Sequence, residues 1–289
     1  MPLLSLCATN YRTHPVTGRS LDSIVSQVSN LDCEIVVVDN FSEDGSYETL
    51  TSYRAPVPIR VVQMRCSRGV GRQLAFRMSR GEYVVTFDLD TVYNRNWGKL
   101  LRALIERPVP FAVTTVYSQF YPRRVLEAVG GWRSFQYWED VDLWIRLAAR
   151  GVYRTYPMIT GENLKRTPGR DRVEKILRLY ARCRDKVAVA DWIPFRLYAG
   201  GYLSLLRRPR LFYHFSIFLL GYAAGRIKRY RLCGSDYDTG LVRNKSLEVD
   251  CGIVPRKELA SSTSPYNTTE GCEEALRRGV VGFLPGTYD

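Results

Sequence analysis

A regular alternation of short apolar runs and amphipathic segments over the first 160 residues constrains the fold more than any other feature. The apolar runs predict strands at residues 3–8, 34–38, 59–64 and 82–87, and the segments between them have apolar side chains at helical spacing. This alternation predicts a mainly parallel sheet with helices on both faces. Because such sheets bind ligands at the carboxyl ends of their strands, polar residues there are the first candidates for a site.

Aspartates follow two of these predicted strands. Asp39 ends the second, and Asp88-Leu89-Asp90 follows the fourth. In an extended chain residues i and i+2 point to one face, so we expect Asp88 and Asp90 to converge with Leu89 packed behind them. Two carboxylates suit Mg²⁺ or Mn²⁺, with other coordination positions left for water and phosphate. The alternative for so short a pattern is a pair of surface acids in a turn.

A basic, glycine-rich segment, Arg68-Gly69-Val70-Gly71-Arg72, precedes the fourth strand. We expect it to form a loop that opens a helix ending at Gly81. Exposed backbone N–H groups, the helix dipole and a guanidinium would all favour an anion there. The alternative is a solvated basic turn.

Three acids, Glu139, Asp140 and Asp142, open a helix predicted to end at Gly151. Acids at a helix start cap free amides and complement the dipole, but three exceed what capping needs. Trp132 and Trp138 precede these acids. Each tryptophan is a candidate platform for stacking on a sugar or an acceptor, and the alternative is that it is a core residue.

Taken together, residues 3–150 resemble the catalytic domain of family 2 glycosyltransferases, which have the GT-A fold. Four pieces match in order: residues 4–12 (LSLCATNYR), 36–46 (VVVDNFSEDGS), 68–90 (RGVGRQLAFRMSRGEYVVTFDLD) and 129–147 (VGGWRSFQYWEDVDLWIRL). The resemblance implies an inverting transfer from a UDP- or GDP-linked sugar with Mg²⁺ or Mn²⁺ as cofactor.

Site roles follow from the same resemblance, position by position. The residues that it implies for the nucleotide sugar are Thr9, Asn10, Arg12, Asp39, Arg72, Asp88 and Leu89. Asp90 would bind the metal directly, and Asp88 would hold the metal or the ribose. Asp140, with Glu139 beside it, would be the general base that deprotonates the acceptor.

Two departures from the family pattern affect this site. Asp39, the expected nucleoside contact, is followed by Asn40 where many relatives have a second Asp. Many relatives also have a metal-binding His after the Glu-Asp helix, whereas the two histidines here are His14 and His214. Glu162 and Asn163 are the residues that could replace it.

The net charge of the chain is confined to one region. Residues 165–231 contain 17 Lys/Arg and 4 Asp/Glu, and the difference equals the +13 of the whole chain. Within this region residues 211–225 have no formal charge if His214 is neutral, and cations flank them on both sides. Such a run is shorter than the roughly 20 residues of a membrane span, and its aromatics and flanking cations suit a helix in the interface of an anionic membrane. The alternatives are a buried helix, a contact in a homodimer, or a short tilted span.

We therefore expect a GT-A catalytic domain in residues 1–164, a helical membrane-associating segment in residues 165–231 and a tail in residues 232–289. The expected acceptor is a hydroxyl or phosphate on a lipid-linked molecule, in glycan biosynthesis. The chain opens on a core strand without a secretory signal, and its seven scattered cysteines form no CxxC. These features favour the cytoplasmic face of the membrane.

Two rival functions remain. A sugar-1-phosphate nucleotidyltransferase would carry its glycine-rich basic loop directly after the first strand, and residues 9–18 have none. A non-enzymatic basic protein would bind a membrane or nucleic acid through its charge. A nucleic-acid surface interleaves cations with polar groups, whereas here the cations flank apolar runs, so we expect no nucleic-acid partner.

Overall fold

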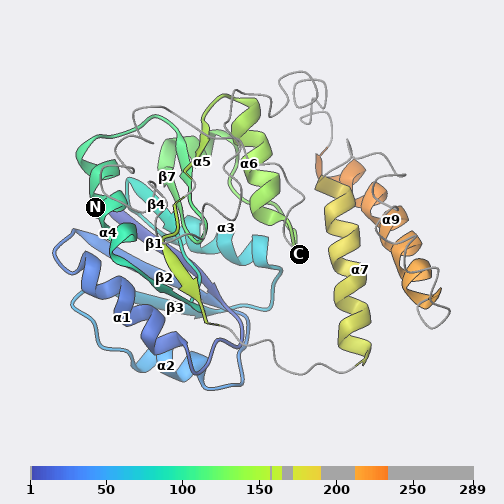
Figure 1. Cartoon of the computed structure of the whole chain (residues 1–289), viewed down its shortest axis with the longest axis horizontal. Helices are drawn as coiled ribbons and strands as arrows, with labels where there is room; N and C mark the ends of the chain where they lie inside the picture. The colour runs from blue at the N-terminus through green and yellow to red at the C-terminus, as the bar shows by residue number, and fades with distance from the viewer. Residues whose placement is uncertain (1, 157, 165–171, 190–211, 234–289) are drawn as a thin grey trace.

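The computed structural model describes residues 2–156, 158–164, 172–189 and 212–233 and contains a twisted sheet with helices on both faces (Figure 1). Its seven strands lie in the order β3-β2-β1-β4-β7-β6-β8. They are β1 (Leu4–Asn10), β2 (Cys33–Asp39), β3 (Ile59–Gln63), β4 (Tyr83–Thr86), β6 (Ala112–Thr114), β7 (Gln119–Pro122) and β8 (Tyr153–Thr155). β7 runs antiparallel to both its neighbours, and the other pairs are parallel. The predicted mainly parallel sheet is confirmed.

Two hydrophobic clusters cover the two faces of this sheet. The helices are α1 (Thr17–Val28), α2 (Ser46–Ser52), α3 (Arg68–Met78), α4 (Arg95–Glu106), α5 (Arg123–Ala128), α6 (Glu139–Ala149), α7 (Arg172–Val189) and α9 (Phe212–Cys233). Along β2, Ile35 and Val37 pack with α1 and α4, whereas Val36 and Val38 pack with α3 and α6. Because both faces are covered, the strand reads as a continuous apolar run.

Two local expectations are wrong. β4 ends at Thr86, so Asp88 lies beyond the strand and Leu89-Asp90 forms a turn instead of extending it. The segment from Arg68 to Arg72 is the first turn of α3 and not a loop. A second small sheet pairs β5 (Thr91–Tyr93), which follows the turn, with β9 (Gly161–Asn163).

The basic region forms a helical pair beside the sheet domain (Figure 1). α7 and α9 pack closely because Gly221 and Gly225 face α7: an added Cβ would lie 2.7 Å from the Cβ of Cys183 and of Val187, respectively. Phe218, Cys183 and Val187 are buried between the helices. None of the helices described is both long and apolar enough to cross a bilayer. Residues 165–171 and 190–211 of the expected membrane-associating segment, and nearly all of the expected tail, lie outside the described residues.

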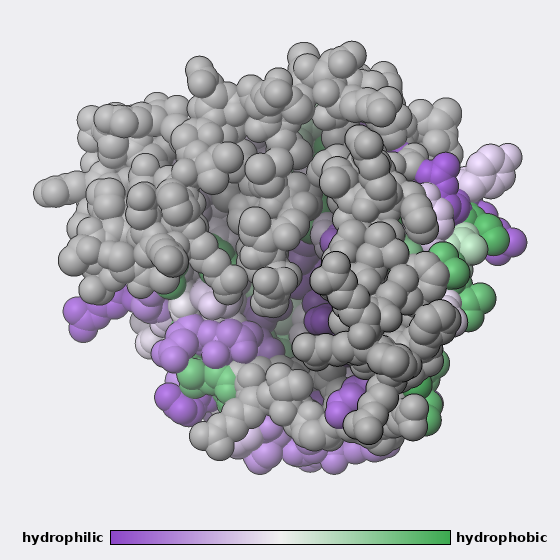
Figure 2. All heavy atoms as spheres, turned by 45° about the vertical axis from the view of Figure 1, so that its right-hand side comes forward, coloured by the Kyte–Doolittle hydropathy of each residue, from purple (hydrophilic) through white to green (hydrophobic). Residues whose placement is uncertain are grey.

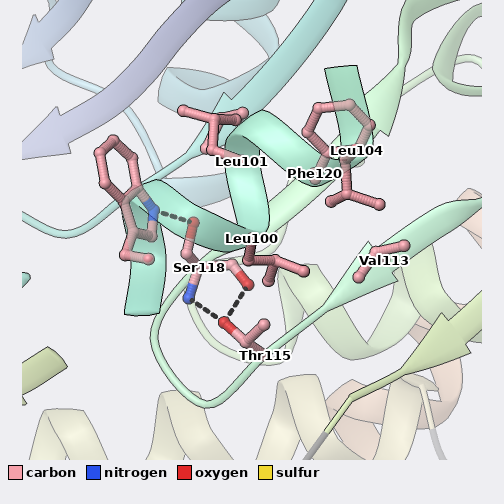
Figure 3. A pocket seen from close by; sticks show the side chains of 9 residues that line it. Leu100, Leu101, Leu104, Val113, Thr115, Ser118 and Phe120 are labelled. Atoms are coloured by element: carbon pink, nitrogen blue, oxygen red, sulfur yellow. Dashed lines mark hydrogen bonds between the residues drawn. The ribbon is translucent and has the colours of Figure 1, made fainter. Parts of the chain in front are cut away.

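One small cavity lies inside the sheet domain, under α4 (Figure 3). Its volume is ≈ 10 Å³, about that of one water probe. Leu100, Leu104 and Phe120 line it, and Ser118 accepts a hydrogen bond from Trp97 Nε1 at 3.0 Å. This cavity is part of the packed core and is too small for a ligand such as the expected nucleotide sugar.

Replacing Gly225 by Leu should open the contact between α7 and α9, because the new side chain would overlap Val187. Overpacking of this kind lowers the stability of the helical pair by about 2 kcal/mol, which corresponds to roughly 30-fold faster amide exchange in both helices. Hydrogen exchange followed by mass spectrometry measures this, with Ala223→Leu on the exposed side of α9 as the control. Equal exchange in the two variants would contradict the packing argument.

Candidate active site

Arg72 joins three acidic side chains at the carboxyl edge of the sheet. Its side chain is 7% exposed, and Nη1 lies 2.5 Å from Asp140 Oδ1. Nη2 lies 3.4 Å from Asp88 Oδ1, and Nε lies 3.6 Å from Glu139 Oε1. Burial opposes the charge of Arg72, but the three carboxylates together hold its pKa above the ordinary value. The residue expected to face a diphosphate is therefore the centre of an ion-pair cluster.

The first turn of α3 is placed by its glycines. The Gly69 N–H donates to Phe135 O at 2.8 Å, and an added Cβ at Gly71 would lie 2.8 Å from Thr9 Cγ2. The side chain of Ser67 caps the helix by accepting from the Val70 N–H. Because these amides already donate within the protein, an anion here would be bound by side chains and not by the backbone.

Glu139 is buried inside the cluster at 2% exposure. Desolvation raises its pKa to about 7, although Arg68 and Arg72 favour the charged form. Glu139 Oε1 lies 3.6 Å from Arg68 Nη1 and accepts no hydrogen bond from any residue that the structure describes. Burial therefore outweighs the two guanidinium groups, and the pKa of Glu139 lies near neutrality.

Asp88 and Asp90 have different partners. The Asp88 N–H donates to the Tyr93 hydroxyl at 2.8 Å, and its carboxylate faces Arg72. Asp90 Oδ1 accepts from Asn163 Nδ2 at 2.9 Å, across the β5–β9 pair. Leu89 is 1% exposed in the core, as expected, so its side chain offers no ligand surface.

Oxygen donors dominate this edge, which fits a divalent cation. Asp90 brings a carboxylate and Asn163 an amide from the neighbouring strand, where the metal-binding His was expected. In the part of the chain described, no three His, Cys, Asp or Glu side chains gather as a ligand set. Mg²⁺ and Mn²⁺ commonly take one or two carboxylates and leave the other positions to water and phosphate, so this donor set is sufficient.

The strand ends of β1 and β2 form a hydrogen-bonded polar cluster. Asp39 is fully buried and accepts from Asn10 Nδ2 at 2.7 Å, from the Ser42 N–H at 3.0 Å and from Gln63 Nε2 at 3.1 Å. Arg12, at the edge, has φ 53° and an exposed contact with Glu43 at 3.7 Å. Asp39 thus fixes the loop that would surround a nucleoside.

The two tryptophans have unlike surroundings. Trp132 is 4% exposed and packs edge-on against Phe76 and Tyr121, and its Nε1 donates to Asp140 Oδ1 at 3.1 Å. Trp138 is half-buried with φ 66°, and the Lys186 ammonium lies 5.3 Å from its ring centre. In this structure Trp132 orients Asp140 and has little surface for stacking.

Comparison with known proteins identifies the family. The model of glycosyl transferase family 2 matches residues 5–159, more than half of the chain. The chain belongs to this family. A relative, the uncharacterized glycosyltransferase YfnE of Bacillus subtilis (strain 168), is 36% identical over 73 residues, which are 25% of this chain and 19% of that protein. The match thus spans about a fifth of the relative's length.

Solved structures are similar to this chain in fold. It is similar to the mannosyltransferase PcManGT from Pyrobaculum calidifontis in complex with GDP-Man and Mn²⁺, with 18% identity and a TM-score of 0.51 over 77% of this chain and 74% of that one. It is also similar to S. aureus TarS 1–349 in complex with UDP-GlcNAc, with 17% identity and a TM-score of 0.47 over 64% and 65% of the two chains. The expected GT-A fold is confirmed.

Two contacts within the candidate site have no signal in the sequence. Trp132 reaches Asp140 from eight positions upstream, and Tyr93 holds Asp88 from beyond the turn. Neither spacing matches a motif. Aromatic residues with polar tips are common in cores, so only the folded chain shows which of them contact the acids.

Replacing Glu139 by Gln should flatten the pH dependence of stability. The pKa of Glu139 is about 7 in the folded chain and 4.5 in the unfolded chain, so the folded state binds more protons between these values. The free energy of unfolding should therefore fall as pH rises from about 4.5 to 7, by on the order of 3 kcal/mol relative to Glu139→Gln. Urea denaturation of both proteins from pH 4 to 8 tests this, and parallel curves would contradict it.

Replacing Arg72 by Gln should destabilise the fold by about 3 kcal/mol or more, because buried carboxylates lose their counter-charge. Arg77→Gln is the matched control, since Arg77 lies on the exposed side of the same helix. Its effect should stay within about 0.5 kcal/mol. Equal midpoints of thermal unfolding for the two variants would show that Arg72 is dispensable.

Proposed function

We propose that the protein is an inverting hexosyltransferase that moves a sugar from a UDP- or GDP-linked donor to a lipid-linked hydroxyl or phosphate acceptor. The observation that carries this proposal is the convergence of Arg72, Asp88 and Asp140 at the carboxyl edge of the sheet, from three separate segments. Family membership supports the reaction class and disfavours the nucleotidyltransferase alternative. The GDP-Man and Mn²⁺ in the PcManGT complex support a nucleotide-sugar donor and a divalent cation.

Asp140 is the proposed general base. Its Oδ1 accepts from both Arg72 and Trp132, which fixes the carboxylate and leaves Oδ2 to take the acceptor proton. A side chain held by two donors keeps the orientation that in-line attack on the anomeric carbon requires. Its 17% exposure allows contact with an acceptor while most of the group stays enclosed.

Charge balance supports a divalent cation beside Asp90. When Glu139 is ionised, four acids (Asp88, Asp90, Glu139, Asp140) face two cations (Arg68, Arg72), an excess of two negative charges. When bound, the metal would neutralise the charge that develops on the leaving diphosphate. Asp90 and Asp88 would hold it, with Asn163 as a further oxygen donor.

The donor's nucleoside would lie over the ends of β1 and β2. The Asp39 network orders Asn10, Ser42 and the exposed Arg12 around this edge, and Thr9 packs against the start of α3. Asp39 would act by shaping this loop, because its own carboxylate is fully enclosed.

The membrane part of the proposal depends on the exposed side of α9. Leu219, Leu220, Ile227 and Tyr230 are 43%, 64%, 56% and 86% exposed, and Arg226 and Arg231 lie on the same helix. With the helical pair turned forward, hydrophobic and hydrophilic residues alternate along the right-hand edge (Figure 2). Such a mixed surface suits peripheral binding to anionic headgroups at the cytoplasmic face of a membrane.

A panel of nucleotide sugars with Mn²⁺ or Mg²⁺, scored by released nucleoside diphosphate, tests the proposed function. Asp90→Ala should lower the rate by at least about 100-fold because it removes the metal ligand, and Asp140→Asn by about 10²–10⁴-fold because it removes the base. Asp32→Ala, an exposed acid at the opposite end of the sheet, is the control. If no donor is bound or turned over, or if Asp90→Ala matches the wild type, the proposal is wrong.

A further inference from the structure

A pocket of ≈ 470 Å³ lies between the start of α3 and the helical pair, and neither Asp88 nor Asp90 lines it. One wall contains Ser67, Ser134 and Gln136 of the catalytic domain. The opposite wall contains Arg184 of α7 and Lys228 and Arg231 of α9. We call this space the joint pocket. Its volume falls within the range of sites that enclose a small molecule.

The lining of the joint pocket is positively charged. It contains three cations and no carboxylate. Behind it, the fully buried Asp185 pairs with Arg184 Nε and Lys228 Nζ, each at 2.8 Å. Among the residues that the structure describes, Asp185 is the carboxylate that forms ion pairs with this lining, and it cannot balance three cations, so the lining is net positive.

Asp185 also fixes the position of the opposite wall. Its Oδ2 accepts from the Gln136 N–H at 2.9 Å and from the Tyr137 N–H at 3.0 Å. The Lys228 ammonium also lies over the Phe135 ring, 4.4 Å from the ring centre. Burial lowers the pKa of Lys228, so an additional anion would favour its charged form. The pocket is therefore built from side chains held in place on both walls.

The joint pocket adjoins the catalytic cluster through Arg68. The Arg68 N–H donates to Gln136 Oε1 at 3.3 Å, and its guanidinium lies 3.6 Å from Glu139. Ser67 is the neighbouring residue, and its hydroxyl lies 3.4 Å from that of Ser134. A ligand that contacts Ser67 would therefore lie next to Arg68, whose guanidinium is paired with Glu139.

We propose that the joint pocket binds a phosphate group, and that this phosphate belongs to the acceptor. Guanidinium and ammonium groups with two hydroxyl donors match the acceptor-only oxygens of a phosphate ester. The remaining volume, beside the exposed Ile227, would take the organic part of the ester. The second half of this proposal rests on the proposed function. A lipid headgroup and a water-soluble ester share this phosphate chemistry, and the vesicle experiment below distinguishes the two sources.

Titration of the full-length protein with inorganic phosphate at constant ionic strength, followed by ³¹P NMR line broadening, tests the first half. Wild type should bind in a saturable way, and Arg231→Ala should weaken binding by about tenfold, because it loses a charge-assisted hydrogen bond. Arg226→Ala removes the same charge from the same helix outside the pocket lining and should bind as the wild type does. Absent saturation, or equal weakening in both variants, would overturn the pocket as a phosphate site.

The source of the phosphate is tested with phosphatidylcholine vesicles containing phosphatidic acid. A phosphorylated lipid is indicated if the protein sediments with these vesicles, and if both Arg231→Ala and added inorganic phosphate reduce the sedimented fraction. Phosphate binding without such sedimentation indicates a water-soluble phosphoester. A protein that binds phosphate but turns over no donor would refute the proposed transferase and leave the phosphate site standing.

Discussion

The ion pairs of Arg72 are the interaction on which the site depends. Asp88, Glu139 and Asp140 come from two segments more than 50 residues apart, and like charges repel one another at short range. A buried guanidinium with five donors in a fixed plane is the side chain best suited to hold three carboxylates at once. The glycines that seat the first turn of α3 against β1 and the loop at Phe135 determine where this guanidinium lies.

The same loop connects the site to the helical pair. Residues 134–138 lead directly into Glu139-Asp140, and Asp185 of α7 holds two of their backbone amides. The close packing of α7 on α9 through Gly221 and Gly225 then brings Lys228 to the other side of Asp185. The basic region therefore contributes to the wall beside the proposed catalytic residues, and it also has an exposed apolar face. A ligand in the joint pocket would contact the loop that leads into α6, the helix that carries the proposed base.

Most of the sheet could be predicted because its strands are short apolar runs with polar ends, and the helices between them are amphipathic. The predictions that failed each applied a local sequence rule beyond the end of the element that it describes. Alternation along a strand predicted an extended Asp88-Leu89-Asp90 segment, but the strand stops at Thr86 and a turn follows. Glycines suggested a loop before α3, yet they serve close packing inside a helix. Trp132 was a candidate for stacking on a sugar because it is aromatic, but in the structure it is buried and donates a hydrogen bond to Asp140.

The sequence by itself determined the family, the GT-A sheet and the acids and arginine that gather at its edge, because periodicity and residue type are local properties. Tertiary structure alone decided the partners. In the folded chain Asp140 accepts hydrogen bonds from Arg72 and Trp132, and Asp90 accepts one from Asn163. Asp185 accepts from a backbone amide of the loop before Glu139. It also decided which carboxyl titrates near neutrality, since desolvation depends on what encloses a group in three dimensions and not on its neighbours along the chain.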